Sequence, residues 1–187
     1  MTEPTGRAES LFQQLQKEQD GKRLPPVHLW NPEHQGEIDM RIARDGTWYY
    51  MGTPIQRKPM VRLFSTVLRR EGDEYFLVTP AEKLSIQVDD APFVAVLLEV
   101  EGEGRAQNLL VTTNTEDHVF VDAEHPLRVE SRDGEPAPYV LVRDTMEALV
   151  SRNVFYQLVA LAEQRSTNGD TELGVWSAGE FFSLGKI

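Results

Sequence analysis

The side chains best suited to bind a ligand stand at the expected start of a helix. Arg57 and Lys58 come directly before Pro59, and proline is favoured in the first turn of a helix. The first N–H groups of a helix have no partner within it, and they make that end electropositive. A cation placed there is unfavourable by about 0.3 to 1 kcal/mol unless an anion accompanies it. This pattern is typical of a phosphate or carboxylate site.

Two structural explanations of these cations stay open beside the ligand site. In the first, an acid from Glu37, Asp39 or the second half of the chain already neutralises them. In the second, both side chains simply extend into water. Ion pairs that only support the structure are commoner than ligand sites, so each explanation competes with binding.

Two further residues extend the candidate ligand site. Arg44 offers another positive charge, and Trp48 offers a flat face on which a base would stack. Aromatic runs such as Trp48-Tyr49-Tyr50 usually pack in the core of a sheet, so this role of Trp48 competes with a structural one. The candidate ligand-binding residues are Arg57, Lys58, Arg44 and Trp48.

No residue pattern indicates a reaction, a metal or a cofactor. The chain has no cysteine, which excludes a disulfide and a thiolate site. Its histidines lack the HExxH spacing, and the acids and histidines between Asp117 and His125 are typical of solvated turns. Ser177, in the run GVWSAG, misses the GxSxG spacing by one residue. We therefore expect no catalytic residue, no metal site and no cofactor.

The segment that carries the candidate residues runs from Glu37 to Arg70. Its pattern predicts a strand ending at Arg44, a tight turn at Asp45-Gly46, and a second strand from Thr47 to Met51. An amphipathic helix follows from Pro59, with arginines opposite its apolar face. That face consists of Met60, Val61, Phe64, Val67 and Leu68.

The flanking segments are predicted from their prolines and their apolar spacing. Glu9 to Gln19 forms a short helix packed by one face, and Pro25 to Pro32 is extended and half-buried because prolines bracket it. Pro92 to Val100 suits a strand covered on both faces. After a β-meander, a helix runs from Val154 to about Arg165, and Leu173 to Leu184 closes the sheet.

A degraded copy of the Glu37 to Arg70 pattern recurs in the second half. Arg44-Asp45-Gly46 matches Arg132-Asp133-Gly134, and Ile55 to Lys58 matches Val150 to Asn153 further on in the same order. Ordered matches favour a duplication over chance similarity between segments of like secondary structure. Asn153 takes the expected N-cap position of the second helix, where the first half has Lys58. Lys58 is therefore the more informative of the two cations.

The chain is predicted to have an α+β fold, with internally duplicated units of antiparallel sheet plus helix. Residues 1–23 form an N-terminal helix and a flexible end, and residues 24–89 form a first β-β-α-β-β unit. Residues 90–187 form a second, larger β-rich unit with one helix. A seam between two such halves is a typical place for a pocket.

Charge and hydropathy exclude some classes of partner. The net charge is −11, although residues 1–70 hold 11 Lys+Arg against 8 Asp+Glu, while residues 71–187 hold 8 against 22. Nucleic-acid binding is not expected, because phosphate backbones favour clustered cations. The N-terminus has no signal-peptide pattern, and no window approaches the roughly 18 apolar residues of a membrane span. We expect a soluble, cytoplasmic protein without membrane contact.

Five long blocks of the sequence carry a resemblance to a known family. They are PPVHLWNP, GEIDMRIARDGTWYYMGTPIQRKPMVRLFSTVLRR, VTPAEKLSIQVDDAPF, PYVLVRDTMEALVSRNVFYQLV and GVWSAGEFFSL. With them the chain resembles the bacterial domain-of-unknown-function family numbered 1285. The resemblance implies a duplicated α+β architecture whose C-terminal half is loosely pleckstrin-homology-like. It also implies a nucleotide-like ligand or a signalling role at the domain interface, and no catalytic activity.

The expected function is a non-enzymatic one. The leading hypothesis is a ligand-sensing or signalling module that binds a phosphate-bearing, nucleotide-like small molecule at the seam between the two halves. The alternative hypothesis is a protein-interaction adaptor with no small-molecule ligand. Such an adaptor would recruit its protein partner through a sheet edge or an exposed apolar surface.

Overall fold

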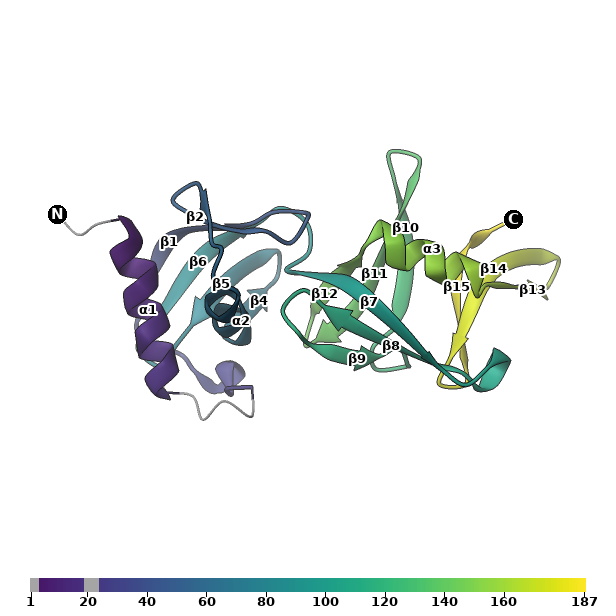
Figure 1. Ribbon diagram of the computed structural model, residues 1–187, viewed down its shortest axis with the longest axis horizontal. Coiled ribbons are helices and arrows are strands. Elements are labelled where there is room, and N and C mark those ends of the chain that lie inside the picture. Colours follow the sequence, from purple (N-terminus) through teal and green to yellow (C-terminus); the bar gives the residue numbers. More distant parts are fainter. Residues whose placement is uncertain (1–3, 19–23) are drawn as a thin grey trace. The chain divides into compact units, whose positions relative to one another are not determined.

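The computed structural model describes residues 4–18 and 24–187, and it divides the chain into two compact units (Figure 1). The first unit is Met1–Asp90 and the second is Ala91–Ile187. Each contains a six-stranded sheet and a nine-residue helix, so the predicted α+β fold with two similar halves is confirmed. No helix in the described residues is long and apolar enough to cross a membrane.

The sheet of the first unit has the strand order β3-β2-β1-β6-β5-β4. Its strands are β1 (His34–Ile42), β2 (Trp48–Tyr50), β3 (Thr53–Pro54), β4 (Leu68–Glu71), β5 (Glu74–Val78) and β6 (Glu82–Val88). The Asp45-Gly46 turn between β1 and β2 is confirmed, since Gly46 donates to the carbonyl of Ala43 and adopts a φ of 90°. However, β1 pairs with β6 in parallel, so the sheet is mixed and not purely antiparallel as predicted.

Two helices build the core of the first unit. α1 (Pro4–Glu18) buries Leu11, Phe12 and Leu15, which confirms the predicted helix, although Gln19 lies outside the described residues. α2 (Lys58–Thr66) contributes Phe64, which is fully buried. The Phe64 ring stacks on Trp48 at 6.3 Å and meets Phe12 edge-on at 6.4 Å. This aromatic cluster joins α1, α2 and β2.

Two further sequence predictions for the first unit are wrong. The segment between the prolines is not extended, because Val27–Leu29 forms a 3₁₀ helix, η1, in which Leu29 is 68% exposed. Arg69 Nη1 donates to the carbonyls of Val27 and Trp30, and these bonds hold the turn in place. The second error is the length of α2, which ends at Thr66 before β4 begins. Val67 and Leu68 are buried, but they lie beyond the helix.

The second unit has a six-stranded sheet in the order β10-β11-β12-β7-β8-β9 and a separate three-stranded sheet, β13-β14-β15. The first sheet comprises β7 (Phe93–Glu101), β8 (Asn108–Thr113), β9 (His118–Phe120), β10 (Leu127–Arg132), β11 (Glu135–Arg143) and β12 (Met146–Val150). The second comprises β13 (Glu163–Thr167), β14 (Asp170–Ser177) and β15 (Glu180–Lys186). A short 3₁₀ helix, η2 (Gly104–Ala106), links β7 to β8. The C-terminal strands therefore do not close the large sheet, contrary to the prediction.

β7 is covered on both faces over only its first three residues. Phe93–Ala95 pairs with β12 in parallel and is buried, whereas Leu97 and Val100 are 59% and 41% exposed. The prediction of a fully covered strand is therefore wrong for the second half of β7. The buried stretch lies inside the sheet between β12 and β8, whereas β12 stops at Val150 and the rest of β7 runs along the sheet edge, paired within the described residues with β8 alone.

The second helix differs from the prediction at both ends. α3 (Arg152–Ala160) starts two residues earlier than expected and ends before β13. Its N-cap is Ser151, whose hydroxyl accepts the Val154 N–H at 3.3 Å, so Asn153 is not the cap. α3 buries Val154 and Leu158 but leaves Val159 exposed.

The matched turns of the two halves stand at the same number of strands before the helix. Arg132-Asp133-Gly134 forms the turn between β10 and β11, and one more strand, β12, precedes α3. Asp45-Gly46 lies between β1 and β2, and one more strand, β3, precedes α2. The sheets differ in which of these strands pairs in parallel, since it is β1 in the first unit and β12 in the second.

Candidate functional site

The start of α2 offers few donors to an anion. Its N-cap is Arg57, which makes no side-chain capping bond, and the second helical residue, Pro59, has no N–H. Met60 and Val61 already donate to the Arg57 carbonyl, at 3.1 and 3.2 Å. Within the described chain, the N–H groups of Arg57 and Lys58 are therefore the two donors of this helix start that have no backbone acceptor.

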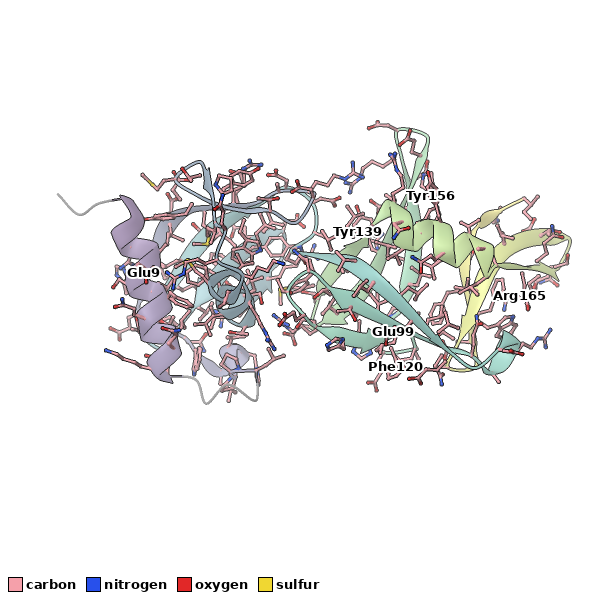
Figure 2. All side chains as sticks on the ribbon, in the orientation of Figure 1. Glu9, Glu99, Phe120, Tyr139, Tyr156 and Arg165 are labelled. Carbon is pink, nitrogen blue, oxygen red and sulfur yellow. The ribbon has the colours of Figure 1, made fainter. Side chains whose placement is uncertain are left out.

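Arg57 has an anion from within the same unit. Its Nη1 donates to Glu9 Oε2 at 2.7 Å, and its guanidinium lies 4.9 Å from the centre of the Phe12 ring. The acid thus comes from α1 (Figure 2), and not from Glu37, Asp39 or the second half of the chain. The charge of Arg57 is therefore explained by an ion pair within the fold, and its partner is Glu9.

Lys58 is the cation at this helix start that keeps its charge unpaired. Its side chain is exposed and forms no ion pair with any other residue that the structure describes. Lys58 is the first residue of α2, and the first residue of α3 is Arg152. Both copies therefore place a cation at the same helical position. What distinguishes them is the cap, which is Ser151 in α3 and the non-capping Arg57 in α2.

The other two candidate residues, Trp48 and Arg44, interact with residues other than Lys58. Trp48 is 1% exposed and stacks on Phe64, so its ring belongs to the core. Its Nε1 is buried and has no hydrogen-bond partner among the described residues. Arg44 Nε lies 3.2 Å from Asp90 Oδ2, at the end of the first unit. In the described part of the chain, no hydrogen bond, ion pair or ring contact joins these two residues to Lys58.

The acids and histidines between Asp117 and His125 serve the fold. Asp117 accepts from Arg143 at 2.7 Å and from the hydroxyl of Thr115 at 2.6 Å. Burial raises the pKa of Asp122, but hydrogen bonds from the backbone N–H and ring of His125 outweigh it and bring that pKa below its ordinary value. Within the described ranges, no group of three such side chains is placed to hold a metal ion.

Ser177 is a structural residue. It is fully buried, its hydroxyl donates to the Val121 carbonyl at 2.6 Å, and the same oxygen accepts the Leu109 N–H at 3.0 Å. The side-chain amide of Gln107 forms another hydrogen bond to β14, donating to the Trp176 carbonyl at 2.9 Å. These bonds attach the three-stranded sheet to Leu109 in β8 and to Gln107 and Val121, which lie directly before β8 and directly after β9.

Sequence reasoning missed an exposed apolar surface on β7, β8 and β9. Strand pairing places Glu99, Leu110 and Phe120 in one row, and Leu97, Thr112 and His118 in the next. Leu97 is 59% exposed, Phe120 is 42% exposed and Leu110 is half-buried. We call Leu97, Leu110 and Phe120 the outer patch; Figure 2 labels Glu99 and Phe120 in this region. The available signal was the alternation Glu99-Val100-Glu101, which is typical of a strand with one solvated face.

Comparison with known proteins places the chain in a family. Residues 25–91 match the N-terminal domain of the domain of unknown function DUF1285, and residues 92–184 match the C-terminal domain. No curated protein matched the chain.

Two crystal structures of family proteins are similar to this one. A DUF1285 family protein from Silicibacter pomeroyi DSS-3 is 48% identical, with a TM-score of 0.86 over 100% of this chain and 97% of that chain. A second, from Shewanella baltica OS155, is 27% identical, with a TM-score of 0.52 over 66% of this chain and 91% of that chain. The chain therefore belongs to the DUF1285 family and contains both of its domains.

Proposed function

We propose that the protein is a non-enzymatic interaction module whose outer patch binds another protein. The observation that carries this proposal is the adjacency of Leu97, Leu110 and Phe120 on one sheet face. Single exposed apolar residues are normal on a protein surface, but neighbouring ones indicate an interaction site. Burying a large apolar side chain contributes about 1.5 to 3 kcal/mol, so Leu97 and Phe120 together would anchor a partner.

Site-specific photocrosslinking tests this function. Benzoylphenylalanine placed at position 120 should capture a discrete protein in the native cell, and Leu97→Ser in the same chain should abolish the capture. Position 156 is the matched control, because Tyr156 is an aromatic residue that is 63% exposed on α3. Equal crosslinking at both positions, or none at position 120, would overturn the proposal.

A second function is a ligand-sensing one, in which a phosphate-bearing, nucleotide-like small molecule binds beside Lys58. It is favoured by the unpaired Lys58 ammonium at a helix start that lacks a side-chain cap. In this function Arg57 would exchange Glu9 for the ligand. Arg44 and Trp48 would contribute only after leaving Asp90 and the core, respectively.

Calorimetric titration with inorganic phosphate and with nucleotides tests the ligand-sensing function. Binding should weaken in Lys58→Ala and stay unchanged in Arg152→Ala, which removes the corresponding cation of α3. Equal binding to both variants, or no heat with any of the anions, would contradict the assignment.

We further propose that the C-terminal half is loosely pleckstrin-homology-like and that the protein works in cytoplasmic signalling. The support for the first point is the sheet of mostly antiparallel strands followed by a single helix, α3. Superposition of Ala91–Ile187 alone on pleckstrin-homology domains checks the likeness, and a TM-score under about 0.5 would contradict it. Fractionation of cells that express the tagged chain checks the compartment.

A further inference from the structure

We propose that the open edge of β7, Val96–Glu101, binds an extended segment of a partner protein in which apolar residues alternate with lysine or arginine. The added segment would become a further strand of the sheet, a mode of recognition called β-augmentation. This inference rests on the proposed interaction function, and it specifies the mode of binding and the chemistry of the partner.

The edge is open because the neighbouring strand stops. β12 pairs with β7 only at Phe93–Ala95, and the last bond on that side runs from the Ser151 N–H to the Ala95 carbonyl at 3.0 Å. From Leu97 to Glu101, β7 pairs with β8 and with no other strand of the described residues. α3 also lies against β7, but Leu97 and Val100 remain 59% and 41% exposed. The helix therefore does not seal this stretch of strand.

The backbone of the open edge has hydrogen-bonding groups to offer. The Leu109 N–H donates to Ser177 Oγ, and the Leu109 carbonyl accepts from the Val121 N–H, so both groups face away from β7. In an antiparallel ladder, the residue opposite then also directs its backbone groups away. Val100 is opposite Leu109, and Leu98 is two residues before it. Leu98 and Val100 therefore present N–H and C=O groups to the open edge.

The side chains of the same stretch give the edge a charge pattern. Leu97, Glu99 and Glu101 point to one face of the strand, and Leu98 and Val100 point to the other. Glu99 and Glu101 form no ion pair with any residue in 4–18 or 24–187. By contrast, Glu130 and Glu147 on the same sheet are both paired with Arg128. Two adjacent unpaired carboxylates on an open strand call for cations on the strand that joins it.

The chemistry of the occupant follows from this pattern. A strand added at the ordinary spacing of about 4.8 Å would place its alternate side chains opposite Glu99 and Glu101, where lysine or arginine fits. Its other side chains would meet Leu98 and Val100, where valine, isoleucine or leucine fits. A second copy of this chain fits poorly, because pairing two β7 edges would gather four carboxylates on one narrow ribbon. Residues 91–187 hold 16 Asp+Glu against 7 Lys+Arg, which further favours a basic partner.

The test uses the full chain, labelled with ¹⁵N, and a capped hexapeptide of alternating lysine and valine. The peptide should slow hydrogen exchange at the amides of Leu98 and Val100. A glutamate–valine peptide should not bind, and a lysine–glycine peptide of equal charge should bind at least about tenfold more weakly, since it lacks the apolar face. Equal binding of the lysine–valine and lysine–glycine peptides would mean attraction of charge alone and would overturn the proposal.

Two pairs of variants separate the edge from general electrostatics. The double variant Glu99→Lys with Glu101→Lys should weaken binding of the lysine–valine peptide by about tenfold or more. The control double variant, Glu135→Lys with Glu180→Lys, changes the net charge equally and should change binding less than about twofold. Val100→Pro removes the Val100 N–H, which faces the open edge, and breaks no hydrogen bond to β8. It should therefore weaken peptide binding about five- to tenfold more than Val100→Ala. Circular dichroism checks that each variant is folded.

The possible failures are distinguishable. If crosslinking at position 120 captures a partner but the edge variants leave that capture and the peptide binding unchanged, the interaction function stands and the edge proposal falls. If neither the outer patch nor the edge affects capture, both fall. If the chain self-associates and Val100→Pro abolishes that association, the occupant is a second copy and the basic partner is overturned.

Discussion

Arg57 and Glu9 form an ion pair between α2 and α1, with 2.7 Å between Nη1 and Oε2. The two side chains are 56% and 39% exposed, so solvent screens their attraction and the pair contributes little to stability. The ion pair instead affects how readily Arg57 can bind an anion. A cation that stands at a helix start, and that would otherwise attract an anion from solution, already has a carboxylate beside it.

Replacing Glu9 by glutamine should therefore change ligand binding more than stability. Glu9→Gln removes the internal competitor for Arg57, so inorganic phosphate should bind a few-fold more tightly, while the free energy of unfolding should fall by less than about 1 kcal/mol. Calorimetry and urea unfolding measure the two effects. Glu18→Gln, an exposed acid at the far end of α1, is the control. Unchanged phosphate binding in Glu9→Gln would show that Arg57 does not compete for anions.

Ser177→Ala should destabilise the second unit through its hydrogen bonds. The substitution leaves the Leu109 N–H and the Val121 carbonyl without the hydroxyl that both contact, in a place where Ser177 is fully buried. We expect a loss of about 1 to 3 kcal/mol in the free energy of unfolding, measured by urea denaturation. Ser166→Ala on the exposed strand β13 should cost less than about 0.5 kcal/mol. Equal effects of the two substitutions would contradict this role of Ser177.

The parts of the fold that could be predicted are those set by nearby residues. The spacing of Leu11, Phe12 and Leu15 specifies α1, and Asp45-Gly46 specifies the turn between β1 and β2. The cap of α3 was misplaced because Ser151 and Asn153 are both good N-cap residues and stand two positions apart. Local sequence therefore predicted the type of each of these elements better than its first residue.

The features that could not be predicted depend on residues distant in the sequence. Arg57 and Glu9 are 48 positions apart, and no local pattern pairs them. The exposure of Leu97 depends on which elements pack over its face of the sheet, and a continuous apolar run is the same in sequence whether or not that face is covered. The burial of Trp48 likewise follows from the meeting of α2 and β2. The candidate site was therefore predicted as a set of residue types, without the contacts that decide their availability.

The Asp45 carboxylate should make the free energy of unfolding of the first unit depend slightly on pH in the acid range. The Thr47 N–H donates to Asp45 Oδ1 at 2.9 Å, and this bond lowers the pKa of Asp45. Because the folded pKa is the lower one, the stabilisation is present above the unfolded value of about 4 and is lost as the pH falls through the folded value. Urea unfolding between pH 7 and pH 3 should show a shallower acid loss for Asp45→Asn than for the wild type. An identical pH dependence would contradict this contribution.

Gly174 should tolerate no side chain, because the Phe181 ring covers it. A Cβ at this position would lie 2.5 Å from the Cε1 and Cζ atoms of Phe181 and 2.5 Å from the carbonyl oxygen of Phe182. The ring could rotate away only by leaving Trp176, which it meets at 5.3 Å, and the carbonyl belongs to the β14–β15 pair. Gly174→Ala should therefore lower the free energy of unfolding by about 1 to 3 kcal/mol in urea. Gly36→Ala, where the nearest atom would lie at an ordinary 3.5 Å, is the matched control and should be nearly neutral. Unfolding of Gly174→Ala at the same urea concentration as Gly36→Ala would mean that β14 and β15 separate readily. The three-stranded sheet would then not be the rigid support for β8 that the hydrogen bonds of Ser177 indicate.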